Sequence, residues 1–335
     1  MQTLIILHTR LIHEHGNTPD SPDRCASDNA GMINHQARAG ILLILVFSLL
    51  MIILPLPGLA SAVDHIEKGD QAWSQRAGGH RGPRAAAEPI ENAIEAYLSA
   101  LNSEPENLEA RWKLLRALHF KGEFVLESEK DRHELYKWGR EIADTGRLQI
   151  ETRYGLRKGF FRTKPEDVVA SVGDQADVAE YCFWAAANWG LWGHYSGKMI
   201  SALTGLVYKI RQLAEVMVLM DESIENGGGH RLLGQFHARV PRVPFFTWWA
   251  DKDLAISEMR LSLQLAPNDL LSKMYLAQAL LKFRPEEKKE AINLLHDIVN
   301  GDPTPERLVE DIEVIENAKV LLSLRLRRKH QNPKV

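Results

Sequence analysis

Cysteine is scarce in this chain of 335 residues, which contains only Cys25 and Cys182. A single chain therefore cannot build a disulfide framework or a zinc site made of several cysteines. An excess of charge of one sign is also lacking, because the formal net charge is -3 at pH 7. Nucleic-acid-binding proteins usually carry a strong basic excess, so nucleic acid is not an expected partner. The fold must rest on packing of the hydrophobic side chains, which make up 45% of the residues.

Sequence motifs of catalysis are missing as well. The chain has no G-x-S-x-G elbow, no Walker loop and no G-x-G-x-x-G. His133 and Glu134 resemble the start of a zinc-protease signature, but Lys137 stands where the second histidine is required. His230 and His237 share one expected helix face with packing positions, so we interpret them as structural rather than as metal ligands or an acid and a base. No enzymatic activity, cofactor or metal is expected.

Long hydrophobic runs are absent except for one near the amino terminus. Residues 41–54 form a run of 14 that is apolar except for Ser48, and Ala60-Ser61-Ala62 has the A-x-A pattern of a cleavage site. The run is shorter than the roughly 20 residues that span a membrane. We interpret residues 32–62 as a Sec signal peptide cleaved after Ala62, which predicts a periplasmic protein. An uncleaved inner-membrane anchor is the alternative. Residues 1–31 are interpreted as a non-native upstream extension, with the start codon at Met32 rather than Met1.

One spacing of residues occurs three times and predicts a helical-repeat fold. A small residue, a bulky apolar residue at offset 4, a small or apolar residue at offset 7 and a proline at offset 12 recur. This is the second-helix pattern of a tetratricopeptide repeat, in which the small residue lets two helices approach and proline ends the helix. The copies are Ala93, Tyr97, Ala100 and Pro105; Ala255, Met259, Ser262 and Pro267; and Ala291, Leu295, Ile298 and Pro303. The predicted fold is all-α, a tetratricopeptide-like solenoid of antiparallel helix pairs over 63–325, with a basic tail at 326–335.

Hydrophobic periodicity predicts the remaining helices. Gly69 and Gly234 are expected to be the small residues of first helices. Residues 151–165 are expected to form a basic loop, either solvated or in contact with an anionic ligand or partner. The aromatic insertion 241–249 is expected to be a packing plug or a binding loop, and glycines 227–229 a flexible connector or an anion cradle. The expected helices are 64–76, 107–120, 127–145, 177–195, 206–220, 230–239 and a capping helix at 304–326.

The helix expected at 177–195 has a second apolar face beside its packing face. A helix apolar over so wide an arc is either covered on both sides or lines a cavity. Leaving a buried amide such as that of Asn188 without a partner costs about 1 to 3 kcal/mol, so we expect this amide to be bonded. We predict that the second face lines a ligand cleft, and ordinary core is the alternative. The candidate ligand-binding residues are Tyr181, Trp184, Asn188 and Trp192 on this face, with Arg231 and Gln235 as candidate polar contacts.

Three short motifs lie between residues 177 and 281: Ala-Asn-Trp-Gly at 187–190, Gly-Gly-His-Arg-Leu-Leu-Gly at 228–234 and Ala-Arg-Val-Pro at 238–241. In these motifs the chain resembles the TatT family, the tetratricopeptide T component associated with TRAP transporters. The resemblance implies a periplasmic helical-repeat protein that assists the solute-binding protein of a TRAP-type uptake system. The chain departs from the family in having no lipobox cysteine in its signal sequence, which members often carry.

The expected partners are the solute-binding protein of that system and a small apolar solute held in a helical cleft. A further copy of the chain, in a homo-oligomer, is considered as well. The alternative function is a generic cell-envelope scaffold that binds a peptide or a domain and no small molecule.

Overall fold

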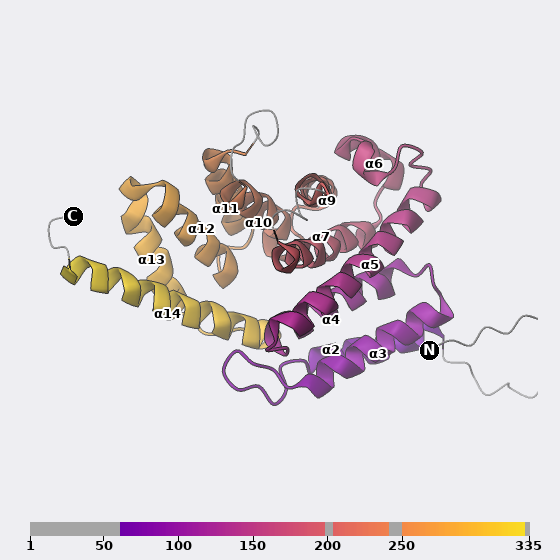
Figure 1. The fold of residues 1–335 in the computed structure, drawn as a ribbon, viewed down its shortest axis with the longest axis horizontal. Coiled ribbons are helices and arrows are strands. Elements are labelled where there is room, and N and C mark those ends of the chain that lie inside the picture. Colours follow the sequence, from indigo (N-terminus) through magenta and orange to yellow (C-terminus); the bar gives the residue numbers. More distant parts are fainter. Residues whose placement is uncertain (1–60, 198–203, 241–249, 332–335) are drawn as a thin grey trace, which may run out of the picture. The chain divides into compact units, whose positions relative to one another are not determined.

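The computed structural model describes residues 61–197, 204–240 and 250–331. In these ranges the chain forms helices and no strand, apart from one isolated bridge between Arg81 and Arg84. The predicted all-α helical-repeat fold is therefore confirmed (Figure 1). Of the predicted signal peptide only Ser61 and Ala62 belong to the described residues, and the predicted aromatic insertion 241–249 lies outside them.

Helices that follow one another in the sequence mostly pack against one another, as α2 does on α3, α10 on α11 and α12 on α13. Helix α7 has more neighbours, because it contacts α4, α5 and α9. The α-helices are α2 (Ala62–Ser74), α3 (Ala87–Ser103), α4 (Leu108–Phe124), α5 (Glu129–Arg153), α6 (Pro165–Val172), α7 (Ala176–Ser196), α9 (Leu206–Met220), α10 (Ile224–Arg239), α11 (Lys252–Leu265), α12 (Leu270–Phe283), α13 (Lys288–Val299) and α14 (Leu308–Gln331). The 3-10 helices are η1 (Phe160–Arg162), η2 (Pro285–Glu287) and η3 (Pro305–Arg307).

The predicted repeat positions are buried where helices cross. A Cβ atom added to Gly69 would collide with the ring of Tyr97, and one added to Gly234 would come within 2.7 Å of the Met259 side chain. The same small-on-bulky contact therefore joins α2 to α3 and α10 to α11. Of the residues in the three copies, those with an exposed fraction of 0% are Ala93, Tyr97, Ala100, Ala255, Met259, Ser262, Ala291, Leu295 and Ile298. Pro105, Pro267 and Pro303 follow the ends of α3, α11 and α13.

Helix α5 extends further than predicted. The sequence indicated an end at 145 and a loop from 151, but the helix continues to Arg153, and α6 begins at Pro165, where no helix was expected. Glu151 stabilises this extension, since its carboxylate accepts hydrogen bonds from Arg147 at 2.6 Å and from the backbone N–H of Phe160 at 2.5 Å. The predicted start of the loop at 151 was wrong. The bond from the N–H of Phe160 to Glu151 depends on the folded chain and cannot be found from hydrophobic periodicity. Helix α14 likewise continues to Gln331, past the predicted start of the tail at 326.

Helix α10 includes the three glycines that were expected to precede it. Its first turn is left-handed, with φ of 49° at Glu225, 59° at Asn226 and 75° at Gly227. A Cβ atom on Gly228 would come within 2.7 Å of the Phe183 ring, and one on Gly229 would collide with Met217. Gly228 and Gly229 thus pack α10 closely against α7 and α9. The predictions of a flexible connector and of an anion cradle were both wrong.

Candidate functional site

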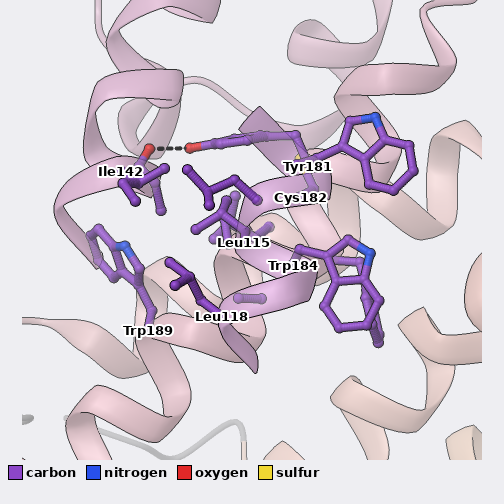
Figure 2. Packing of buried hydrophobic residues seen from close by; sticks show 14 of the residues in the cluster. Leu115, Leu118, Ile142, Tyr181, Cys182, Trp184 and Trp189 are labelled. Carbon is purple, nitrogen blue, oxygen red and sulfur yellow. Dashed lines mark hydrogen bonds between the residues drawn. The ribbon is translucent and has the colours of Figure 1, made fainter. Parts of the chain in front are cut away.

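The predicted ligand-binding face of α7 does not form a single surface. Tyr181 and Asn188 are buried, with exposed fractions of 1% and 0%. The Tyr181 hydroxyl donates a hydrogen bond to the carbonyl of Ala143 (Figure 2). Nδ2 of Asn188 donates to the carbonyls of Leu115 and Trp184 at 3.0 and 2.8 Å, so the predicted bonding is confirmed for this group, while Oδ1 of Asn188 is buried without a partner. Both side chains close α7 onto α4 and α5.

Two glycines of α5 make this contact, and the sequence analysis did not single them out. A Cβ atom on Gly139 would collide with the Asn188 amide, and one on Gly146 would come within 2.6 Å of the Tyr181 ring. Gly139 and Gly146 are seven residues apart, as are Tyr181 and Asn188 on α7. The spacing of seven, two helical turns, was the signal that could have paired these helices.

Trp184 and Trp192 lie apart from this contact. The Trp184 ring lies beside His119, with 5.5 Å between ring centroids, and Figure 2 shows it on the opposite side of the buried cluster from Trp189. Trp192 instead lies under Arg140, whose guanidinium carbon is 4.3 Å from the ring centroid. The four predicted residues therefore fall into a closed contact, Tyr181 with Asn188, and two separate tryptophan environments.

The two candidate polar contacts on α10 have different surroundings. Arg231 is 4% exposed and donates hydrogen bonds to the carbonyls of Glu225 and Asn226 at 2.7 and 3.0 Å. It also lies 3.4 Å from the Asp269 carboxylate. The guanidinium thus satisfies the left-handed turn and ties it to the start of α12, rather than pointing to Trp184. Gln235 is partly exposed on the same helix.

Polar atoms without partners gather around Trp184. Ten buried side-chain nitrogen and oxygen atoms in the described ranges have no hydrogen-bond partner, and six of them lie on side chains of this neighbourhood. Buried polar atoms are normally bonded, so a local excess of unbonded ones marks a place where polar chemistry is incomplete. We call this set the Trp184 cluster: Nε of Arg116, Nδ1 of His119, Oε2 of Glu180, Nε1 of Trp184, Nε of Arg307 and Oε2 of Glu310.

The cluster is assembled from α4, α7, η3 and α14. Burial lowers the pKa of His119, while the nearby carboxylates, Glu310 among them, act to raise it. Arg307 lies 3.9 Å from the carboxylate of Glu225 at the start of α10. These charges act on His119 from helices that are distant in the sequence. The cluster is therefore a product of the tertiary fold.

Glu180 is the most perturbed carboxyl group of the cluster. Burial raises its pKa to about 7, and the negative charge of Glu225 adds to the effect, while Arg116 and the neighbouring indole N–H of Trp184 oppose it. Near neutral pH the carboxyl group therefore exists in both forms. It can accept a hydrogen bond when ionised and donate one when protonated.

At one edge of the cluster, a residue near the start of the described chain, Arg76, contacts a residue near its end, Glu310. Arg76, in the turn after α2, binds the Glu310 carboxylate of α14 at 3.0 Å, and the Arg76 and Glu310 side chains are 10% and 17% exposed. Arg76 also donates to the carbonyl of Glu306. The guanidinium carbons of Arg76 and Arg116 lie 4.2 and 4.1 Å from the centroid of the Trp73 ring. These contacts hold Arg116 and Glu310 in place at the cluster.

The two histidines that were interpreted as structural are buried in packing positions, with exposed fractions of 7% and 8% for His230 and His237. The His230 ring binds Glu258 at 2.7 Å, and this hydrogen bond raises the pKa of His230. Nδ1 of His237 accepts the backbone N–H of Asp251 at 3.3 Å, and burial lowers the pKa of His237. In the part of the chain that the structure describes, no three His, Cys, Asp or Glu side chains gather as metal ligands.

Comparison with protein-family models and with curated proteins found no match for this chain. A search of the described helices for one long and apolar enough to cross a membrane found none.

Proposed function

We propose that the chain is a non-enzymatic, tetratricopeptide-like protein that binds a small solute at the Trp184 cluster and assists a TRAP-type solute uptake system in the periplasm. The observation that carries this proposal is the set of six buried, unpartnered polar atoms on helices that meet only in the folded chain. A closed core leaves few such atoms unpaired, because an unpaired buried polar group costs about 1 to 3 kcal/mol. A bound solute with polar atoms would pair them.

The donor and acceptor groups of the cluster narrow the chemical class of the solute that the sequence predicts. The Nε–H groups of Arg116 and Arg307 and the Nε1–H of Trp184 donate, whereas Oε2 of Glu180 and of Glu310 accept. The indole ring adds an apolar surface next to these groups. The proposed solute therefore carries both donor and acceptor atoms on a small apolar body, rather than being wholly apolar.

The proposed partner is the solute-binding protein of the uptake system. The support for it is the resemblance of the Gly-Gly-His-Arg-Leu-Leu-Gly motif, whose residues in this chain pack α10 against its neighbours. Gly228 meets Phe183, Gly234 meets Met259, and Arg231 binds the left-handed first turn of the helix. The motif thus supports a shared way of packing helices, and the partner is inferred from the family that carries it.

The alternative function, a cell-envelope scaffold without a small ligand, has its own supporting observation. Leu254, Leu261 and Leu265 lie along one face of α11 and are 46%, 41% and 38% exposed. Residues spaced by seven and four positions share a helix face, so these leucines offer an apolar strip to a partner helix or peptide. The scaffold function is favoured if no solute accompanies the protein.

The proposed location in the periplasm requires cleavage of a signal peptide close to the start of α2. Ser61 caps this helix: its side chain accepts the N–H of Asp64 at 3.2 Å, and the Asp64 carboxylate accepts the N–H of Ser61 at 2.8 Å. Cleavage after Ala62, as the sequence predicts, would remove this cap, whereas a cut after Ala60 would keep it. N-terminal sequencing of the protein from its native periplasm is expected to find Val63, or Ser61 if the cap is kept. A chain that begins at Met1 and stays in the inner membrane would contradict export.

Mass spectrometry of small molecules released from the purified periplasmic protein tests the solute-binding function. We expect one species in near-stoichiometric amount in the wild type and its loss in Glu180→Gln and Trp184→Ala. Trp138→Ala is the matched control, because Trp138 on α5 is 36% exposed and lies outside the cluster. Circular dichroism shows whether each variant is folded. A folded wild-type protein that releases no such molecule, yet captures an envelope protein, would replace the proposed function by the scaffold.

A further inference from the structure

We propose that α5, α7, η1 and α9 carry a second binding site, for an organic carboxylate with an apolar body. This site, the cation–aromatic surface, is independent of the Trp184 cluster and goes beyond the proposed function. Figure 2 shows Trp189, one of its residues, on the opposite side of the buried cluster from Trp184. The surface consists of Arg140 and Arg147 on α5, Phe161 in η1, Trp189 and Trp192 on α7, and Lys209 on α9.

Cations lie over the aromatic rings along the whole surface. The guanidinium carbon of Arg140 is 4.3 Å from the centroid of Trp192, and Nζ of Lys209 is 4.5 Å from that of Trp189. Phe161 extends the part around Trp189, because its ring centroid is 5.5 Å from that of Trp189. Lys209 and Arg147 also lie over Phe161, at 5.7 and 5.5 Å. The pair of Arg140 and Trp192 is related to this part by charge, since Arg140, Arg147 and Lys209 all act on Asp144.

The cations are incompletely paired. Arg147 binds Glu151 at 2.6 Å, but in the described ranges neither Arg140 nor Lys209 has a carboxylate within ion-pair distance. The Nε atoms of Arg140 and Arg147 are buried and have no hydrogen-bond partner. Asp144 lies 3.8 Å from Nε of Arg147, which is too long for a hydrogen bond. Donor groups therefore remain for a ligand.

The balance of charge favours an anion. Three cations, Arg140, Arg147 and Lys209, act together on Asp144, yet burial outweighs them and raises the pKa of its carboxyl group. Burial lowers the pKa of Lys209, and repulsion by the two arginines adds to that effect. The three cations outnumber the two carboxylates that Arg147 contacts, Asp144 and Glu151, which fits an anionic ligand.

The kind of anion follows from the geometry of the cations. A guanidinium presents its N–H groups as a planar fork that matches the two oxygens of a carboxylate, whereas an ammonium acts as a point charge. The partly exposed Phe161 ring lies beside the cations and offers contact to an apolar group. Inorganic phosphate would use the charges alone, so a carboxylate attached to a ring or a short chain uses more of the surface.

Isothermal titration calorimetry of the full chain with benzoate tests this site. Benzamide is the matched neutral ligand, and we expect it to bind about tenfold more weakly, because hydrogen bonds to a charged group contribute about 1.5 to 3 kcal/mol. Arg140→Gln and Lys209→Gln should each weaken benzoate binding about fivefold or more on the same basis. Lys137→Gln is the control, since its side chain on α5 is 52% exposed. Arg140→Lys keeps the charge without the fork and should lose less affinity than Arg140→Gln.

Several results would overturn the proposal. Benzoate that does not bind, or that binds no better than benzamide, would exclude a carboxylate site. Unchanged benzoate affinity in folded Arg140→Gln and Lys209→Gln would place any binding elsewhere. Inorganic phosphate that displaces benzoate at equal concentration would show that the surface selects charge only, and would reject the organic ligand.

Discussion

The two sides of α7 carry similar residues and use their polar atoms differently. On one side, the Tyr181 hydroxyl and the Asn188 Nδ2 group donate to backbone carbonyls of α4, α5 and α7, and only Oδ1 of Asn188 is left without a partner. On the other side, Oε2 of Glu180 and Nε1 of Trp184 are buried without partners. Similar polar and aromatic residues on one helix can therefore end in a closed core or in an incomplete polar site. The outcome depends on the residues of the helix that packs against them.

Glycine explains the closed side. Gly139 and Gly146 let the α5 backbone approach so closely that side chains of α7 can bond to main-chain groups. Long charged side chains occupy the other side, where Arg116 and Glu225 act on Glu180 through space. Long side chains bring charge to the Trp184 side of α7, whereas the glycines bring backbone close to the Tyr181 side.

Removing a ring from the closed side should have the largest effect. Tyr181→Ala is expected to lower the free energy of unfolding by about 3 to 5 kcal/mol, because a fully buried aromatic side chain is replaced by a cavity. Denaturant unfolding followed by circular dichroism measures the change. A loss under about 1 kcal/mol would mean that this side is not closed core.

Replacing glycine by alanine at two positions distinguishes the effect of a close helix contact on stability from the effect of helix propensity. Gly146→Ala should destabilise the protein by about 1 to 3 kcal/mol, because the new Cβ meets the Tyr181 ring. Gly190→Ala in α7 is the matched control, since its Cβ would lie 3.7 Å from the nearest atom, on Ile210. There the change should stabilise by about 0.5 to 1 kcal/mol through helix propensity. Equal effects at both glycines would contradict the assigned contact.

Glu180, on the Trp184 side of α7, should make the stability of the protein depend on pH. Because the folded-state pKa of Glu180 is raised from 4.5 to about 7, the folded protein holds a proton that the unfolded chain releases. Stability should therefore fall as pH rises from 4.5 to 7 and then level off. Glu180→Gln should remove this slope and stabilise the protein at pH 8 by about 1 to 2 kcal/mol, after allowance for partial solvent access. Identical pH profiles for wild type and variant would show that Glu180 is not perturbed.

The repeat frame was predictable because its contacts join helices that are neighbours in the sequence. Gly69 with Tyr97 and Gly234 with Met259 follow one rule of spacing, in which a small residue meets a bulky one. Gly139 and Gly146 follow no repeat, so their partners on α7 could be found only in the folded chain.

The Trp184 cluster was predictable only in part. Trp184 itself stood out in the sequence, but Arg307 and Glu310 come from the other end of the chain and leave no trace in the periodicity of α7. Tyr181 and Asn188 were predicted to share a helix face with Trp184, yet they lie in the closed contact because Gly146 and Gly139 stand opposite them. Periodicity predicts that a face is covered, while the covering residues determine its chemistry.

The most direct test of the solute site is the indole N–H resonance of Trp184 in protein labelled with ¹⁵N at tryptophan. The buried Nε1 of Trp184 has no hydrogen-bond partner, whereas Trp138 is 36% exposed on α5 and serves as an internal reference. The solute recovered from the periplasmic protein is added back to protein stripped of it. We predict that the Trp184 resonance shifts with saturation while the Trp138 resonance stays in place. A solute that binds, as calorimetry would show, without moving the Trp184 resonance would contradict the assignment of the Trp184 cluster as its site.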